Sequence, residues 1–246
     1  LRIVINAANI EKDVAHFREH ASGRCELVDR SDELALIAVQ GPKAVGIVAE
    51  LAGDPGLRDV PSFGLRDTTI PWNGAGIDVT AARTGYTGED GVELAVPADH
   101  APAVWDAVVA AGVTPAGLGA RDTLRLEMGL PLHGHELGPG ITPLQAGLGW
   151  VVAWGKGEFR GRAALEAERE RGITRRLRGL VVEGRRPPRA DQPVLVGGEP
   201  VGVVTSGNFS PSLEVGIALA FVPPDLDAGA DVAIDVRGTA VPARLA

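Results

Sequence analysis

Six short apolar runs in the C-terminal part of the chain place the strongest constraint on its fold, because Gly and Pro interrupt them at close intervals. Short strands between turn residues are typical of small all-β modules. We therefore predict a C-terminal all-β domain over residues 174–246, built as a small barrel or a sandwich. Its predicted strands are 180–182, 194–196, 201–205, 216–221, 232–236 and 240–243.

The chain before this domain mixes helix and strand patterns, which predicts an α+β fold of several lobes. Residues 34–115 follow the order strand, helix, two strands, helix, strand, which is the split βαβ arrangement of a ferredoxin-like lobe. Its predicted strands are 34–39, 77–82, 92–96 and 113–115, its helices are 41–51 and 101–110, and a loop fills the stretch between 51 and 77.

Two further segments complete the predicted organisation. Residues 1–33 are expected to be the remainder of the first α+β lobe, and residues 116–173 a return segment to that lobe. Their predicted elements are strands over 1–5 and 25–28, a helix that Asn9 caps, and helices over 117–127 and 163–171.

The charge balance and the single cysteine exclude several classes of function. A formal net charge of −8 argues against broad electrostatic binding to nucleic acid or to an anionic membrane surface. Cys25 is the only cysteine, which excludes an internal disulfide and a cysteine-only metal site and fits a reducing compartment. No apolar run approaches the roughly 20 residues of a membrane span. We predict a cytoplasmic protein that binds neither nucleic acid nor membrane.

The stretch from Arg83 to Glu93 contains three glycines, one tyrosine and three carboxylates. Asp90 and Gly91 suit the two central positions of a type I′ hairpin, because both residue types tolerate a positive φ. In that register Tyr86 and Glu93 lie diagonally on one face of the hairpin. A ring beside a carboxylate suits a flat heterocycle that stacks on the ring and donates N–H groups to the carboxylate. An ordinary hairpin with a packed tyrosine and a solvated glutamate is the alternative.

Other polar motifs provide weaker signals. His133 and His135 are ligand types for zinc, but we favour turn or interface histidines, because their spacing matches no known metal site. The serines of 206–212 lack the Gly-x-Ser-x-Gly pattern of a nucleophile elbow, and the glycines of 140–149 lack the ending of a phosphate loop. These stretches therefore do not indicate a hydrolase or a nucleotide-binding protein.

Arg121 and Arg125 lie one turn apart in the predicted helix over 117–127, so one of the two arginines can point inward. Arg121 either reaches solvent or pairs with an acid in a partly buried place. Glu93 is an available partner, and both interpretations stay open.

Several of these stretches together resemble the glycine cleavage system T protein family of aminomethyltransferases, in order and spacing over essentially the whole chain. They are residues 6–9, 83–93, 119–130, 142–150 and 202–221. The resemblance implies a three-lobed protein that binds tetrahydrofolate in a central cavity. It also implies the family's reaction. Tetrahydrofolate takes the aminomethyl group from the lipoyl arm of the H protein, ammonia leaves, and 5,10-methylenetetrahydrofolate forms.

The resemblance assigns folate binding to Glu93, Tyr86, Arg121, Val4 and Asn6. Glu93 matches the family's pterin-reading glutamate, Tyr86 its nearby tyrosine and Arg121 its site arginine. A carboxylate can accept two strong N–H bonds from a pterin edge, because one partner is charged. Tetrahydrofolate is thus the expected substrate and the lipoylated H protein the expected partner, without a metal.

The sequence departs from the family pattern at three positions. Arg2 stands where many members have an aromatic residue, which puts one stacking contact in question. His133 replaces a common tyrosine, and Gln145 replaces a common glutamate.

The resemblance places the family's catalytic aspartate in a segment before Leu1, so no catalytic acid is assigned within this chain. Acid–base or electrostatic help contributes factors of about 10² to 10⁴ to a rate. We therefore expect this chain alone to be a poor catalyst, and one that aggregates more readily than an intact protein.

Three other functions stay open. A folate-binding demethylase domain of the dimethylglycine or sarcosine oxidase type shares the Tyr to Glu pattern, but this sequence contains no flavin-binding segment. A folate-binding protein of iron–sulfur cluster assembly is disfavoured, because residues 154–158 replace its Lys-Gly-Cys-Tyr type motif. A non-catalytic folate-binding protein is the third alternative, and the missing aspartate favours it.

Overall fold

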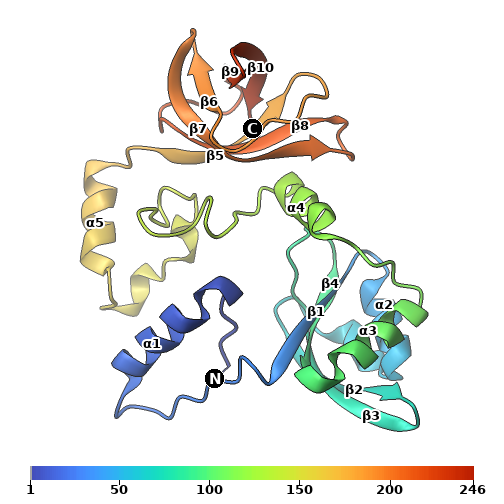
Figure 1. The fold of residues 1–246 in the computed structure, drawn as a ribbon. Helices are drawn as coiled ribbons and strands as arrows, with labels where there is room; N and C mark the ends of the chain where they lie inside the picture. The colour runs from blue at the N-terminus through green and yellow to red at the C-terminus, as the bar shows by residue number, and fades with distance from the viewer. Residues whose placement is uncertain (1) are drawn as a thin grey trace. The chain divides into compact units, whose positions relative to one another are not determined.

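The computed structural model describes residues 2–246. The chain forms two compact units, Leu1–Gly117 and Leu118–Ala246 (Figure 1), and each unit has a hydrophobic core of its own. The finer division into segments 1–33, 34–115, 116–173 and 174–246 stays a prediction.

The first unit begins with an irregular segment, a short 3-10 helix η1 (Ala7–Asn9) and the helix α1 (Ile10–Ala21). The predicted helix is confirmed with Asn9 at its N-cap position, but the side-chain cap bond belongs to η1. Asn6 accepts a hydrogen bond from the backbone N–H of Ala8 at 3.2 Å, whereas the side chain of Asn9 makes no cap bond.

The predicted strands over 1–5 and 25–28 are wrong for the described residues, because 2–5 and 25–28 form no strand. Leu1 lies outside the described residues. Short β-branched runs are weak evidence for a strand when nothing pairs with them.

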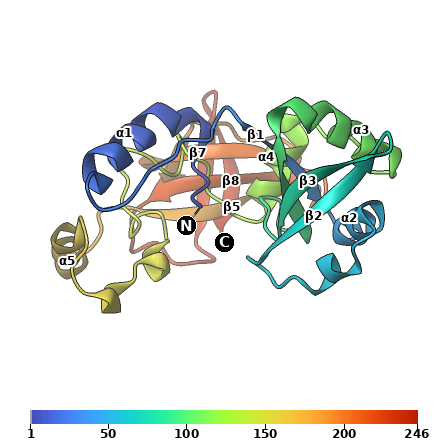
Figure 2. The same ribbon diagram turned by 90° about the horizontal axis from the view of Figure 1, so that it is seen from below.

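The centre of the first unit is a four-stranded antiparallel sheet with the strand order β1-β4-β3-β2 (Figures 1 and 2). Two helices pack on one face of the sheet. The elements are β1 (Leu34–Gln40), α2 (Ala44–Ala52), η2 (Pro55–Asp59), β2 (Leu65–Trp72), β3 (Ala75–Ala82), β4 (Gly91–Pro97), η3 (Ala98–His100) and α3 (Ala101–Ala110).

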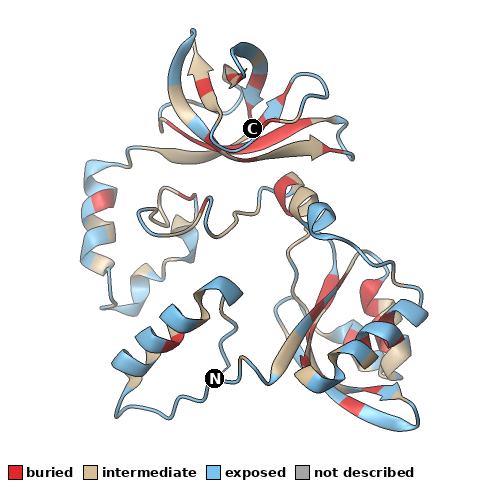
Figure 3. Cartoon of the chain, in the orientation of Figure 1, coloured by how far each residue is buried: buried red, intermediate tan, exposed pale blue. Residues whose placement is uncertain are grey.

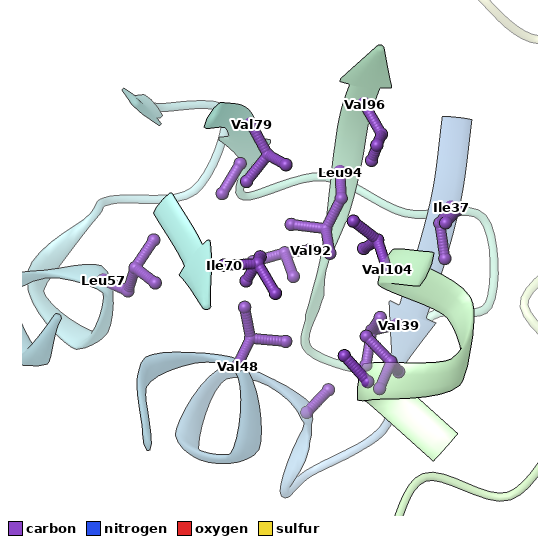
Figure 4. Packing of buried hydrophobic residues seen from close by; sticks show 14 of the residues in the cluster. Ile37, Val39, Val48, Leu57, Ile70, Val79, Val92, Leu94, Val96 and Val104 are labelled. Carbon is purple, nitrogen blue, oxygen red and sulfur yellow. The ribbon is translucent and has the colours of Figure 1, made fainter. Parts of the chain in front are cut away.

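The apolar residues of one sheet face form the core with α2 and α3 (Figure 4). Along β4, Val92, Leu94 and Val96 are almost fully buried, whereas the residues between them are only partly buried. Val48 of α2 and Val104 of α3 are 0% exposed and pack against this face. The period of two along the strand therefore separates a buried face from a second, more exposed face.

The element order differs from the predicted split βαβ arrangement at two points. A strand, β2, lies where the sequence predicts a loop, and residues 113–115 form no strand. β2 is an edge strand in which only Ile70 is buried, so it lacks the apolar run of a central strand and tolerates Pro71. Val113 packs against the core without joining the sheet.

The second unit begins with α4 (Leu118–Glu127) and contains α5 (Arg162–Arg171), which confirms both predicted helices. The connection between them includes the short 3-10 helices η4 (Gly149–Val151) and η5 (Trp154–Lys156). Leu126 of α4 is buried against Ile217 and Leu219, so this helix is part of the second unit's packing.

The rest of the second unit is a closed antiparallel barrel with the strand order β10-β5-β8-β7-β6-β9. All the predicted C-terminal strands are confirmed, and the barrel is the correct alternative. The strands are β5 (Arg176–Val182), β6 (Pro193–Val196), β7 (Glu199–Ser210), β8 (Val215–Val222), β9 (Asp231–Val236) and β10 (Thr239–Leu245). Figure 3 shows buried residues along these strands, where their apolar side chains form the barrel core.

The α+β fold class with a C-terminal all-β barrel is therefore confirmed. Within residues 2–246, no helix combines the length and the apolar character that are needed to cross a membrane.

Candidate functional site

Residues 83–90 form a loop between β3 and β4, so the predicted two-residue hairpin at Asp90 and Gly91 is wrong. β3 ends at Ala82 and β4 begins at Gly91, with Ala82 paired to Glu93. The type I′ signal belongs instead to Asn73 and Gly74, which join β2 to β3 with φ values of 50° and 78°. Asn73-Gly74 and Asp90-Gly91 both have residue types that suit this turn, but the Asp90 side chain forms an ion pair with Arg83.

That ion pair closes the loop. Arg83 donates two hydrogen bonds of 2.7 Å to the two carboxylate oxygens of Asp90, and a third of 2.8 Å to the carbonyl of Val60. The hydrogen bonds from Arg83 lower the pKa of Asp90, and those to Asp90 raise the pKa of Arg83. Two parallel hydrogen bonds between a guanidinium and a carboxylate are the strong form of such an ion pair.

Glu93 lies on the more exposed face of the sheet, opposite α2 and α3. We call this the open face and define it by Leu36, Ala38, Thr80, Ala82, Glu93 and Ala95. Glu93 is paired with Ala38 on one side and with Ala82 on the other. Because its neighbours across both strands are alanines, the carboxylate is bordered by small side chains on this face.

Thr84, which the sequence analysis did not single out, holds the Glu93 carboxylate. The Thr84 hydroxyl donates to Glu93 Oε2 at 2.5 Å, a length typical of a hydroxyl bonded to an ionised carboxylate. Glu93 is partly buried, so it keeps some contact with solvent. The arrangement supplies an anionic acceptor on a sheet face, which suits a ligand with N–H donors.

Tyr86 does not lie on a strand, because it sits in the middle of the 83–90 loop. The predicted diagonal placement of Tyr86 and Glu93 on paired strands is therefore wrong. Tyr86 is partly buried, and it follows Thr84 by two residues in the loop that contacts Glu93.

The predicted residues Val4 and Asn6 lie in the segment before α1. Val4 is 75% exposed, and Asn6 is occupied as the cap of η1. Two residues before Val4, Arg2 donates a hydrogen bond of 3.2 Å to the Thr80 hydroxyl on the open face. This bond connects the N-terminal segment with the face that carries Glu93.

Arg121 and Arg125 of α4 have different environments, as their spacing allows. Arg125 points inward and is 2% exposed, whereas Arg121 is exposed. Arg125 donates to Asp122 and Glu136 and, at 2.8 Å, to the hydroxyl of Ser206 on β7. The spacing in the sequence predicts that one of the two arginines points inward, but it does not show which one.

His133 and His135 lie in a turn of the second unit. Nδ1 of His135 is 2.8 Å from the carbonyl oxygen of Thr205, so this nitrogen carries the proton and donates. In the described part of the chain, no group of three or more His, Cys, Asp or Glu side chains is arranged to hold a metal ion.

Comparison with known protein families covers most of the chain. Residues 1–156 match the family described as the GCVT N-terminal domain. Residues 175–246 match the family described as the glycine cleavage T-protein C-terminal barrel domain. The second match coincides with the closed barrel of β5 to β10.

Individual relatives give the same result. The chain is 47% identical over 246 residues to an aminomethyltransferase of Rubrobacter xylanophilus, with 99% of this chain and 64% of the relative covered. It is 48% identical over 244 residues to an aminomethyltransferase of Mycolicibacterium paratuberculosis, with 97% of this chain and 65% of the relative covered. The chain therefore spans somewhat less than two thirds of the length of these relatives.

A solved structure resembles this fold closely. The crystal structure of the glycine cleavage system aminomethyltransferase T from Bartonella henselae aligns with a TM-score of 0.85 and 34% sequence identity. The alignment covers 98% of this chain and 65% of that structure.

Proposed function

Since the chain belongs to the glycine cleavage T-protein family, we propose that it functions as a tetrahydrofolate-dependent aminomethyltransferase of the glycine cleavage system. In this proposal tetrahydrofolate is a substrate. The lipoylated H protein is the partner that carries the aminomethyl group, and the reaction takes place in the cytoplasm.

The observation that carries the proposal is the environment of Glu93. Its carboxylate lies on the open face between Ala38 and Ala82, with Thr84 bonded to Oε2. An ionised carboxylate accepts hydrogen bonds and donates none, so it matches the N–H groups on the edge of a pterin. Hydrogen bonds to a charged acceptor are roughly twice as strong as neutral ones.

The other binding roles belong to the residues that the family resemblance selects. Tyr86 supplies a ring for the flat pterin, and Arg121 supplies a permanent positive charge for an anionic part of the reactants. Val4 provides an apolar contact and Asn6 a polar one from the segment before α1. We propose no metal in this site.

The proposed reaction exchanges two bonds at one carbon. The methylene carbon loses its bonds to sulfur and to the amine and gains bonds to two folate nitrogens. The two folate N–H groups lose their protons, which end on the lipoyl thiol and the ammonia that leave. Residues of this chain bind and orient folate in this scheme. We assign none of them the acid–base role.

The test is the affinity of the 246-residue chain for tetrahydrofolate, measured by isothermal titration calorimetry. Glu93→Gln keeps the shape of the side chain but removes its charge and one acceptor. We expect binding to weaken by more than about 1 kcal/mol. Glu89→Gln is the matched control, because Glu89 is an exposed acid of the neighbouring loop. Equal affinities of the wild type and Glu93→Gln would refute the assigned role.

A further inference from the structure

Gln40, the last residue of β1, fills the inside of the loop 83–90. Its side-chain nitrogen donates toward the carbonyl oxygens of Thr84, Val39 and Val92 at 3.1, 3.3 and 3.3 Å. Its side-chain oxygen accepts a hydrogen bond of 3.0 Å from the Thr87 hydroxyl. One partly buried amide therefore connects two strands with the loop that joins β3 to β4.

Two glycines make room for this amide. A Cβ atom on Gly85 would collide with the end of the Gln40 side chain. A Cβ atom on Gly91 would lie 2.7 Å from the side-chain nitrogen of Gln40 and 2.5 Å from the carbonyl oxygen of Val39. Neither contact distance is available to a real side chain, so these glycines allow the backbone to close around Gln40.

Gln40 is linked to Glu93 through a single residue. Thr84 is held at both ends of its backbone, because its N–H donates to the carbonyl of Ala82 at 2.8 Å and its carbonyl accepts from Gln40. Its hydroxyl then donates to Glu93 Oε2.

We infer that Gln40 and Thr84 are positioning residues for Glu93. Gln40 fixes the loop backbone at Thr84, and Thr84 fixes one oxygen of the carboxylate, so that the carboxylate is presented to a ligand in one orientation. This inference rests on the proposed function for the identity of the ligand. A side chain that is already ordered loses less conformational freedom when it binds, and the ligand is bound more tightly for that reason.

The binding arm of the test measures tetrahydrofolate affinity in two variants at Thr84. Thr84→Val removes the hydroxyl and keeps the shape, and we expect it to weaken tetrahydrofolate binding about fivefold, because Glu93 must then be ordered by the ligand. Thr84→Ser keeps the donor and should bind within about twofold of the wild type.

A double-mutant cycle separates positioning from a general structural role. In a Glu93→Gln background, Thr84→Val should change tetrahydrofolate affinity by less than about twofold, because the charged acceptor that Thr84 orients is gone. An equal, additive loss in both backgrounds would overturn the inference, as would full affinity in Thr84→Val.

A second arm needs no ligand. Gln40→Met has a similar length without the amide, and we expect it to raise hydrogen exchange at the backbone amides of Gly41 and Thr84 about tenfold, since both are bonded around the loop. Gln192→Met, a partly buried glutamine of the barrel unit, is the control and should leave these amides unchanged.

The two arms distinguish the two proposals. A wild-type chain that binds no tetrahydrofolate contradicts the proposed function, but the exchange measurement still tests the positioning. Unchanged exchange at Gly41 and Thr84 in Gln40→Met would overturn the role of Gln40 whatever the binding result.

Discussion

Each unit contains a pair of charged side chains that shows a different environment. In the first unit, Asp90 and Glu93 keep contact with solvent beside the open sheet face. In the second unit, Arg125 and Glu136 are 2% and 0% exposed and face each other. A buried charge has to be paired within the protein, whereas a carboxylate at a surface can exchange water for a ligand. The comparison indicates a structural role for the buried charges, whereas Glu93 keeps the solvent contact that its proposed binding role requires.

The buried group connects separate parts of the second unit. Arg125 donates to Asp122, to the carbonyl of Leu130 and to Ser206 on β7, while Glu136 accepts from Arg125 at 3.3 Å and from the N–H of Leu132 at 2.8 Å. These bonds fasten the end of α4 and the following turn to the barrel wall.

Removing Arg125 should have the largest effect on stability. Arg125→Met leaves the carboxylate of Glu136 buried without its cation, and we expect the second unit to lose about 3–5 kcal/mol of unfolding free energy. Urea unfolding followed by circular dichroism measures this loss. Arg121→Met is the matched control on the same helix and should change stability by less than about 0.5 kcal/mol, because Arg121 is exposed.

The double variant Arg125→Met with Glu136→Leu sharpens the comparison. If the cost comes from an unpaired buried charge, then removing the second charge should restore much of the stability. A double variant as unstable as Arg125→Met alone would show that the hydrogen bonds of Arg125 to Ser206 and Leu130 carry the effect instead.

The difference between the units also explains what the sequence could predict. Each barrel strand combines a buried apolar set with flanking turn residues, so the strands from β5 to β10 are readable locally. The open sheet is harder, because β2 is an edge strand with one buried residue and contains a proline. Because β2 is mostly exposed, it has no apolar run, and the prediction of a strand depends on such a run.

The candidate site was predictable only in part, for a related reason. Glu93 follows from its residue type and from the family resemblance, but its supports come from distant parts of the chain. Gln40 lies 44 residues from Thr84 along the sequence, and the two meet only after β1 pairs with β4. Local patterns contain no information about such a contact, so the sequence does not identify Gln40 and places Gly91 in a two-residue turn.

A substitution at Gly91 tests whether close packing around Gln40 requires a glycine there. The expected loss of stability is smaller than for Arg125→Met. Gly91→Ala places a methyl group 2.5 Å from the carbonyl oxygen of Val39 and displaces Gln40. We expect the first unit to lose about 1–3 kcal/mol, as for other overpacked sites. Thermal unfolding of the variant measures the change.

Gly119→Ala is the control for this experiment, because an added Cβ on that helical residue meets no atom within 4 Å. It should be neutral or slightly stabilising, since Ala favours a helix more than Gly does. If Gly91→Ala is equally harmless, then close packing around Gln40 is not the reason for glycine at position 91.

The smallest predicted effect concerns the ion pair of Arg83 and Asp90 at the solvent-exposed end of the site. The pKa of Asp90 is lowered in the folded chain by its hydrogen bonds from Arg83. The folded protein therefore releases this proton more readily than the unfolded chain, whose aspartates have a pKa of about 3.9. The stabilisation is present above about pH 4 and is lost as the pH falls through the lower folded pKa.

Asp90→Asn should accordingly cost less than about 1 kcal/mol near pH 7, because the pair is partly exposed. The difference from the wild type should shrink as the pH is lowered from 7 toward about 3, because the unfolded carboxylate binds a proton there more readily than the folded one. Urea unfolding at both pH values measures it. Asp227→Asn, an exposed acid in the barrel unit, should differ from the wild type by less than about 0.5 kcal/mol at either pH. If the Asp90→Asn deficit is instead the same at both pH values, then Asp90 holds the loop through its shape and neutral hydrogen bonds, and the contrast between surface and buried charges does not extend to this pair.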